Sequence, residues 1–285
     1  MAIAVAVAAG AGSALAYGAA TAGQHAAAYT GELNAGRLAD LARDPRWLLA
    51  SLGDVVGVLL QVLALGNGAV VLVQPLLVLS LPVAVVLRSW FGAPPPTRGD
   101  LGNCLLLIGA LSLFFILLGE PHRGRVLATS AAGWTTAVAV LVGALAIVAF
   151  RSRRPVPRVI VFGAVAGSWF GVVSVLIEAV TAVWQADGLG GFGAAAGLVP
   201  LAGVVLLSVL GYLLVQVGFQ LGPLGASFPP NLILNPVVAV VLGTVLLGER
   251  VSLSGLRIPG YLLCLLLTAR ATIRLAGAAP PHPVR

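Results

Sequence analysis

Two carboxylic acids lie inside long apolar stretches, and they are the residues best suited to chemistry. Asp54 follows Ser51 in a run of leucines and valines, and Glu178 precedes Thr181 in another apolar run. A charge at the centre of a membrane span costs about 2.5–3.5 kcal/mol on insertion scales, so it is retained for a function by default. Asp54 and Glu178 are candidates to bind a coupling proton, a cation or a cationic group of a solute. The structural alternatives are a carboxyl group satisfied by Ser51 or by backbone for Asp54, and a side chain that reaches the membrane interface for Glu178.

A second set of candidates consists of uncharged polar and aromatic side chains in the apolar segments. Such groups either contact a ligand or bond one helix to another. Trp169 and Tyr212 fall in the middle of their segments, where stacking on a substrate and packing in the core are both open. The candidate substrate-binding residues are Gln61, Gln216, Asn231, Asn235, Gln74, Trp169 and Tyr212.

Two of the apolar segments each contain more than one proline. One interior proline costs a soluble helix about 3 kcal/mol, whereas a membrane helix tolerates it where neighbouring groups satisfy the freed backbone. We expect residues 222–249 to form a spanning helix whose first half is irregular. The candidate hinges are Pro75, Pro82, Pro230 and Pro236.

Signatures of enzymes and cofactor sites are missing from the sequence. His25, His122 and His282 lie outside the apolar segments or at their ends, and no Gly-x-Ser-x-Gly or Walker sequence occurs. Cys104 and Cys264 are isolated in apolar runs, so we interpret them as small hydrophobic residues. We therefore expect no enzymatic activity, no cofactor and no bound metal.

The composition places the candidates in a membrane. Of the 285 residues, 59% are apolar and 9% are charged, against about 25% charged residues in typical soluble domains. The sequence predicts an all-α polytopic membrane protein whose surroundings are the lipid bilayer. A net charge of +7 fits basic cytoplasmic loops better than a nucleic-acid surface. The partners expected are a small-molecule or ion substrate and no nucleic acid, with a homodimer left open.

Nine segments are long and apolar enough to span a bilayer of ~30 Å. The first lacks the basic start of a signal peptide, so we interpret it as a retained helix, with cleavage near Ala20 as the alternative. The segments cover approximately residues 2–22, 47–66, 68–88, 101–118, 131–150, 159–184, 195–217, 223–247 and 255–273.

The arginines divide unequally between the two sides of these nine spans. One side receives twelve arginines, and the other receives only Arg123, Arg125, Arg250 and Arg257. The positive-inside rule places the richer side in the cytoplasm. The sequence thus predicts a multi-pass protein of the plasma membrane with its N-terminus outside and its C-terminus in the cytoplasm.

The chain repeats itself at an offset of about 155 residues. Gly12-Ser13 recurs as Gly167-Ser168, and Gln61 recurs as Gln216. The Pro82 segment, Pro-Val-Ala-Val-Val-Leu, recurs at Pro236 with one residue of slippage. Four spans are paired with four others after a shift of five, an odd number, so the copies have opposite orientation. Inverted repeats with interrupted helices are typical of secondary transporters, with the site near the midplane.

The repeat predicts the organisation of the chain. Residues 1–122 form the first repeat, 123–158 a linking fifth helix and a basic loop, 159–275 the second repeat, and 276–285 a disordered tail. Because Gln61 and Gln216 occupy equivalent positions, we expect them to approach each other around the pseudo-two-fold axis and line a polar pocket. A duplicated bundle without a transport role is the structural alternative.

The sequence around the second proline segment resembles a known family. Asn235-Pro236, Gly243 and Gly248-Glu249-Arg250 are similar to the end-of-repeat signature of the drug/metabolite transporter superfamily, EamA-like branch. In the first half Pro82 is present, but Arg88-Ser89-Trp90 replaces the Gly-Glu ending. The resemblance implies two inverted repeats with one helix of ten lost, and it implies that Glu249 caps the end of its own helix.

A looser resemblance links residues 103–112 and Glu120-Pro121 to the nine-helix NIPA-type magnesium transporters. The family resemblance implies a secondary transporter that moves a small solute or metabolite by alternating access, with proton exchange as the favoured driving force. The alternatives are a NIPA-like carrier of magnesium or another divalent cation, and a membrane scaffold that transports nothing.

Overall fold

The computed structural model describes residues 2–28, 43–91, 94–119, 124, 126–150, 155–221, 224–252 and 254–277. Within these ranges the chain is helical and contains no β-strand. Nine helical segments of the described chain are long and apolar enough to cross a membrane. The predicted all-α class and the predicted number of spans are confirmed, and the protein is an integral membrane protein with many spans.

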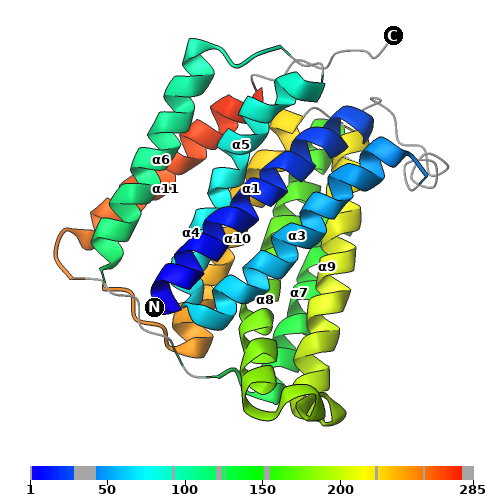
Figure 1. Cartoon of the computed structure of the whole chain (residues 1–285), viewed down its shortest axis with the longest axis vertical. Coiled ribbons are helices and arrows are strands. Elements are labelled where there is room, and N and C mark those ends of the chain that lie inside the picture. The colour runs from blue at the N-terminus through cyan, green and yellow to red at the C-terminus, as the bar shows by residue number, and fades with distance from the viewer. Residues whose placement is uncertain are drawn as a thin grey trace.

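The helices follow one another in alternating directions, and α1 begins at the opposite end of the bundle from the end of α11 (Figure 1). Short 3₁₀ segments, η1 (Leu77–Leu79), η2 (Arg88–Phe91) and η3 (Gly188–Gly193), and a π-helical turn, η4 (Gly243–Leu247), interrupt or extend them. The α-helices are α1 (Ala2–Ala28), α3 (Pro45–Asn67), α4 (Val70–Leu76), α5 (Ser80–Leu87), α6 (Arg98–Leu118), α7 (Thr129–Phe150), α8 (Pro155–Asp187), α9 (Ala195–Leu221), α10 (Leu224–Leu242) and α11 (Arg257–Gly277).

The third span is divided into α4, η1, α5 and η2 rather than built as one helix. Pro75 lies one residue before the end of α4, and Pro82 lies in the first turn of α5. Each proline lacks the N–H that would bond the carbonyl four residues earlier, so the regular hydrogen-bond ladder is lost around η1. This interrupted span is also the most deeply enclosed, with 78% of its apolar window buried in the protein.

The eighth span differs from the expectation of an irregular first half. The backbone is α-helical from Leu224 to Leu242 through Pro229, Pro230 and Pro236. Each proline removes a single donor and holds φ near the helical value, so the helix continues past it. The irregular part is instead its end, where η4 leads to Gly248 in the left-handed conformation with φ of 70°.

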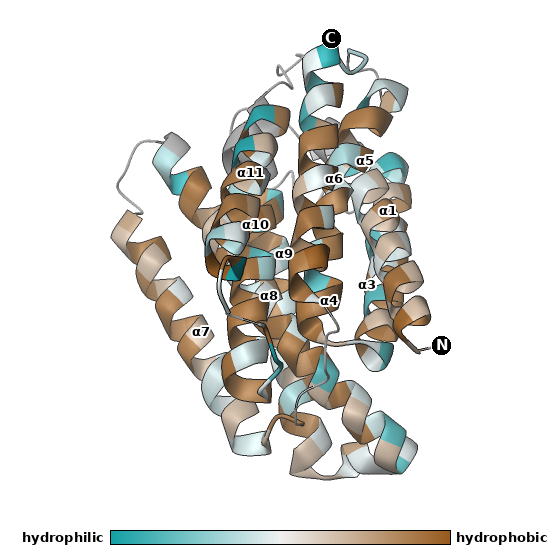
Figure 2. Cartoon of the chain, turned by 90° about the vertical axis from the view of Figure 1, so that its left-hand side faces the viewer, coloured by the Kyte–Doolittle hydropathy of each residue, from teal (hydrophilic) through white to brown (hydrophobic). Residues whose placement is uncertain are grey.

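Two helices organise the packing. α1 packs against α3 and α5, and α8 packs against α9 and α10, while α6 pairs with α11. The sixth span, α8, is 72% buried along its apolar window, and α7 at the edge is only 6% buried. Figure 2 shows α7 set to one side of the bundle with apolar residues along its length, as expected for a helix that faces lipid.

Glycines allow these central helices to approach closely. A methyl carbon on Gly18 of α1 would lie 2.5 Å from the carbonyl oxygen of Ser80, and one on Gly171 of α8 would lie 2.7 Å from that of Asn235. Neither position has room for a larger side chain. Small residues of this kind let the backbones of membrane helices come into direct contact.

Candidate functional site

A cluster of polar side chains joins α1, α3 and α9 near the end of the bundle where α3 begins. The Gln24 side chain donates from Nε2 to Asp54 Oδ2 and to Ser51 Oγ, the latter at 3.2 Å. Gln216 Nε2 donates to Gln24 Oε1 at 2.8 Å, and the Tyr212 and Ser51 hydroxyls share a bond of 3.3 Å. We refer to Gln24, Trp47, Ser51, Asp54, Tyr212 and Gln216 as the Gln24 cluster.

Within the Gln24 cluster, Gln24 is the hydrogen-bond partner of Asp54. The sequence did not predict this partner. The carboxylate is bonded by an amide of α1 rather than directly by Ser51. The first span was expected to end near residue 22, whereas α1 continues to Ala28 and carries Gln24 into the bundle, where it is 3% exposed. The only sequence signal for this contact was that Gln24, a polar residue, lies just beyond the first apolar segment.

Tyr212 and Gln216 are both members of the cluster. The Trp47 ring meets the Tyr212 ring edge-on, with centroids 6.3 Å apart, and Trp47 Nε1 lies 3.4 Å from Gln216 Oε1. These contacts bind α3 of the first half to α9 of the second half. Among the described residues, the polar groups of the cluster are directed at one another.

Gln61 belongs to a different set of hydrogen bonds. Its Oε1 accepts from the Tyr17 hydroxyl at 2.8 Å, and its Nε2 donates to Ser174 Oγ at 3.3 Å. Trp47, which contacts Gln216, lies nearly four helical turns earlier on α3, or roughly 21 Å along the axis. The expectation that Gln61 and Gln216 meet is wrong, because repeat-related positions on α3 and α9 face different neighbours at different depths.

Glu178 is buried inside the helix bundle. Its side chain is 7% exposed, and the Thr181 hydroxyl donates to its backbone carbonyl at 2.9 Å. α8 continues to Asp187, more than two turns past Glu178, so the carboxyl group cannot reach the helix end. Glu178 is therefore a buried acid, and its depth in the membrane stays a prediction.

Glu249 connects the two halves at the opposite end of the bundle from the Gln24 cluster. Its carboxylate is 2% exposed and accepts from the backbone N–H groups of Val70 at 2.7 Å and Val71 at 2.9 Å. These groups open α4, where the first N–H groups of a helix have no partner within it and where the helix dipole favours negative charge. Glu249 therefore caps the start of α4 and not the end of its own helix, since the backbone there closes through Gly248.

Three of the predicted amides lie in the third and eighth spans. Gln74 is 0% exposed, and neither its Oε1 nor its Nε2 has a hydrogen-bond partner among the described residues. The Oδ1 atom of Asn235 is also buried without a partner in that part of the chain. Asn231 is 8% exposed, and its backbone lies against Gly167, where a methyl carbon would be 2.5 Å from the Asn231 carbonyl oxygen.

Trp169 has a structural role. It is 5% exposed, packs against Gly143 of α7 and donates from Nε1 to the Ala139 carbonyl at 2.8 Å. The ring thus holds α7 to α8, and the packing interpretation fits better than stacking on a substrate. The two cysteines are buried and free, as expected.

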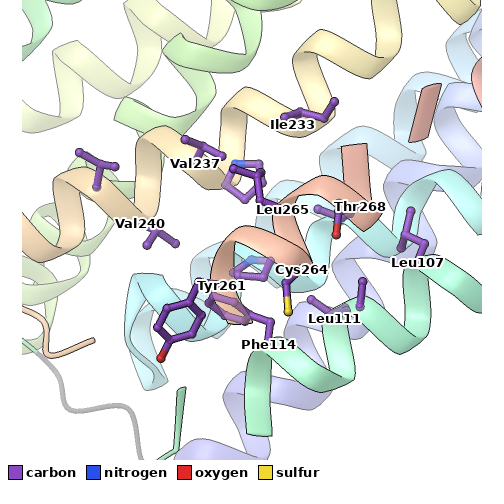
Figure 3. Close-up of a pocket in the computed structure, with 15 residues that line it drawn as sticks. Leu107, Leu111, Phe114, Ile233, Val237, Val240, Tyr261, Cys264, Leu265 and Thr268 are labelled. Carbon is purple, nitrogen blue, oxygen red and sulfur yellow. The ribbon is translucent and has the colours of Figure 1, made fainter. Parts of the chain in front are cut away.

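A cavity of about 190 Å³ lies where α4 and η1 meet α6, α10 and α11. Figure 3 shows side chains from α6, α10 and α11 converging on it, among them Phe114, Val237 and Tyr261. Its walls include Pro75 of the third span and Pro236 of the eighth, whereas Pro82 and Pro230 do not line it. The hollow is apolar and adjoins the third and eighth spans, in contrast to the polar pocket expected between the glutamines.

Comparison with known proteins adds one relative. An uncharacterized protein of Corynebacterium glutamicum is 28% identical over 229 residues, which cover 77% of this chain and 75% of the relative. No family model matches the chain. No solved structure matches it either. Fold and site thus define an integral membrane protein with nine described spans and an internal cavity beside two proline-bearing ones.

Proposed function

We propose that the protein is a secondary transporter of the drug/metabolite type, which moves a small solute across the plasma membrane by alternating access. The observation that carries the proposal is the cavity bounded by Pro75 and Pro236, one from each half of the chain. Interrupted or proline-bearing spans around a central cavity are characteristic of secondary transporters, because such spans change shape at a defined point.

The packing supports two inverted repeats. In the first half, α1 contacts the second and third spans. In the second half, α8 contacts the second and third spans of that half, α9 and α10. The backbone approach of Gly18 to Ser80 is matched by that of Gly171 to Asn235, at nearly the offset found in the sequence. Equivalent helices are related by a shift of five spans, an odd number, so the copies would have opposite orientation.

Hydrogen bonds that join the halves near both ends of the bundle support a mechanism of alternating access. At one end Glu249 of the second half bonds α4 of the first half. At the other end Gln216 of the second half bonds Gln24 of the first. In the proposed cycle each connection opens in turn while the other holds, which exposes the cavity to one side of the membrane at a time.

Proton exchange is the proposed driving force, with Asp54 or Glu178 as the coupling group. Asp54 is half-buried and bonded to a neutral amide, Gln24, which can also accept from a protonated carboxyl group after rotation. Protonation would therefore alter the connection between Gln24 and Gln216. Uptake driven by a pH gradient in proteoliposomes should be lost in Asp54→Asn or in Glu178→Gln; if both variants keep it, these acids are not the coupling groups.

The proposed orientation places the Gln24 cluster toward the cytoplasm and Glu249 toward the outside. It rests on the arginine distribution, with twelve residues on one side and four on the other. Impermeant labelling of a cysteine at Leu256, which is 86% exposed, should succeed in intact cells. Labelling only after the membrane is opened would reverse the orientation.

Cross-linking between the halves tests alternating access, whichever solute is carried. The test variant carries Gln24→Cys and Gln216→Cys in a background with Cys104→Ser and Cys264→Ser. A short bis-methanethiosulfonate reagent joins the two introduced cysteines. A reagent is needed because Gln24 and Gln216 meet only at the ends of their side chains, which leaves their backbones too far apart for a direct disulfide. A panel of small solutes is screened for flux in proteoliposomes. Flux that stops on cross-linking and returns on reduction supports the transporter, and each single-cysteine variant is the control. Flux that persists in the cross-linked protein contradicts alternating access.

The solute-flux assay in proteoliposomes also tests the two alternative functions, a divalent-cation carrier and a scaffold that transports nothing. No group of three or more His, Cys, Asp or Glu side chains that could hold a metal ion occurs in the described part of the chain, so the structure adds no support for the first. Magnesium flux that depends on Asp54 would favour the carrier. Absence of flux for every solute, with and without the cross-link, would favour the scaffold.

A further inference from the structure

The cavity beside Pro75 and Pro236 limits the chemistry of its occupant. None of its lining residues is charged, and the lining side chains that carry a polar group are those of Tyr261, Cys264 and Thr268. The Tyr261 hydroxyl already donates to the Leu117 carbonyl at 3.0 Å. A charged or fully hydrated solute would lose its hydration there without compensation, which costs several kcal/mol or more.

The size of the cavity fits one ring or a short alkyl group. An apolar protein cavity of about 150 Å³ holds benzene, and this one measures about 190 Å³. Val241 and Leu265 stand on its wall while remaining 53% and 39% exposed on the surface of the bundle. An apolar group can therefore enter from the lipid between α10 and α11.

Two amide side chains with buried polar atoms stand next to the prolines that line the cavity. Gln74 directly precedes Pro75 and lies four residues before Val78, and both of these neighbours line the cavity. Its amide is completely buried, and neither polar atom has a partner among the described residues. An unsatisfied buried amide costs roughly 1–3 kcal/mol, so a ligand that supplies the missing bond is favoured. Asn235 precedes Pro236 in the same way, with a buried Oδ1 that also lacks a partner there.

We infer that the site binds an uncharged amphipathic molecule, with an aromatic ring or short alkyl group in the cavity and a hydrogen-bonding group on the amide of Gln74. The inference rests on the proposed transporter and names the class of its substrate. It differs from the polar or ionic cargo that the Asp54 and Gln216 side chains would suggest, because both of those side chains are hydrogen-bonded to Gln24.

Photolabelling in proteoliposomes tests the cavity. An apolar trifluoromethylphenyl diazirine is irradiated with the reconstituted protein, and labelled residues are mapped by mass spectrometry. Label on cavity residues such as Ile233 and Cys264 should be competed by excess ethylbenzene, whereas label on Leu145 of α7, which is 60% exposed and does not line this cavity, should not. Val241→Trp should abolish the competed fraction. Leu262→Trp, at a surface position of similar exposure (56%) that does not line the cavity, should leave it unchanged.

The polar half of the inference is tested by exchanging the competitor. Benzyl alcohol should compete less well in Gln74→Leu than in the wild type, by roughly two- to tenfold for one neutral hydrogen bond, and ethylbenzene should compete equally in both. Comparing each compound with itself across variants removes differences in lipid partition. Label that no competitor displaces, a competed fraction that survives Val241→Trp, or benzyl alcohol competition unaffected by Gln74→Leu would overturn the inference. The readout is binding, so these results are independent of the cross-linked flux assay.

Discussion

Replacing Glu249 should weaken the structure far more than its position in a connecting segment suggests. The carboxylate accepts two backbone N–H groups at 2.7 and 2.9 Å and is 2% exposed. Hydrogen bonds to a charged group contribute about 1.5–3 kcal/mol each, so Glu249→Ala removes roughly 3–6 kcal/mol and leaves Val70 and Val71 without acceptors. Glu249→Gln keeps one acceptor oxygen but turns an NH₂ group toward the second N–H, and should lose about half as much.

Thermal unfolding of the purified protein in detergent measures the effect. The expected order of stability is wild type, then Glu249→Gln, then Glu249→Ala. The matched control is Arg250→Gln at the adjacent residue, which is exposed and should unfold at the wild-type temperature. Hydrogen exchange followed by mass spectrometry should show faster exchange at the start of α4 in both Glu249 variants. Wild-type stability in Glu249→Ala would refute the capping role and, with it, this connection between the halves.

Three further predictions concern the packing and the buried polar groups. Gly171→Leu should abolish folding, because its side chain would collide with the Asn235 carbonyl, whereas Gly109→Leu, with nothing within 4 Å, should express normally; detergent gel filtration compares them. Gln74→Leu should raise the free energy of unfolding by roughly 1–3 kcal/mol, because it removes a buried amide without a partner among the described residues. Gln185→Leu should lower the free energy of unfolding, because it breaks the 2.9 Å bond to the Gly66 carbonyl. Thermal unfolding measures both changes. Tyr17→Phe should cost about 1 kcal/mol through the lost bond to Gln61 in the same measurement, and an unchanged midpoint would contradict that bond.

The sequence alone determined the class of the protein and the number of its spans. Runs of apolar residues long enough for a bilayer are local features, and each of the nine predicted segments has a helical counterpart in the described chain. The prolines marked the third and eighth spans as unusual, because the loss of a backbone donor is a property of the residue itself. Burial of both cysteines followed from their apolar neighbours in the same way.

Only the tertiary structure decided which polar groups meet. Asp54 pairs with Gln24, Gln61 with Tyr17 and Ser174, and Glu249 with the start of α4, whose residues lie far away along the chain. Hydropathy fixes how deep a residue lies in the membrane but leaves undetermined which face of its helix meets which neighbour. The facing of the helices depends on tertiary contacts such as the close approach of Gly18 in α1 to Ser80 and of Gly171 in α8 to Asn235. As a result of this packing, the cavity lies among apolar side chains and not between the glutamines.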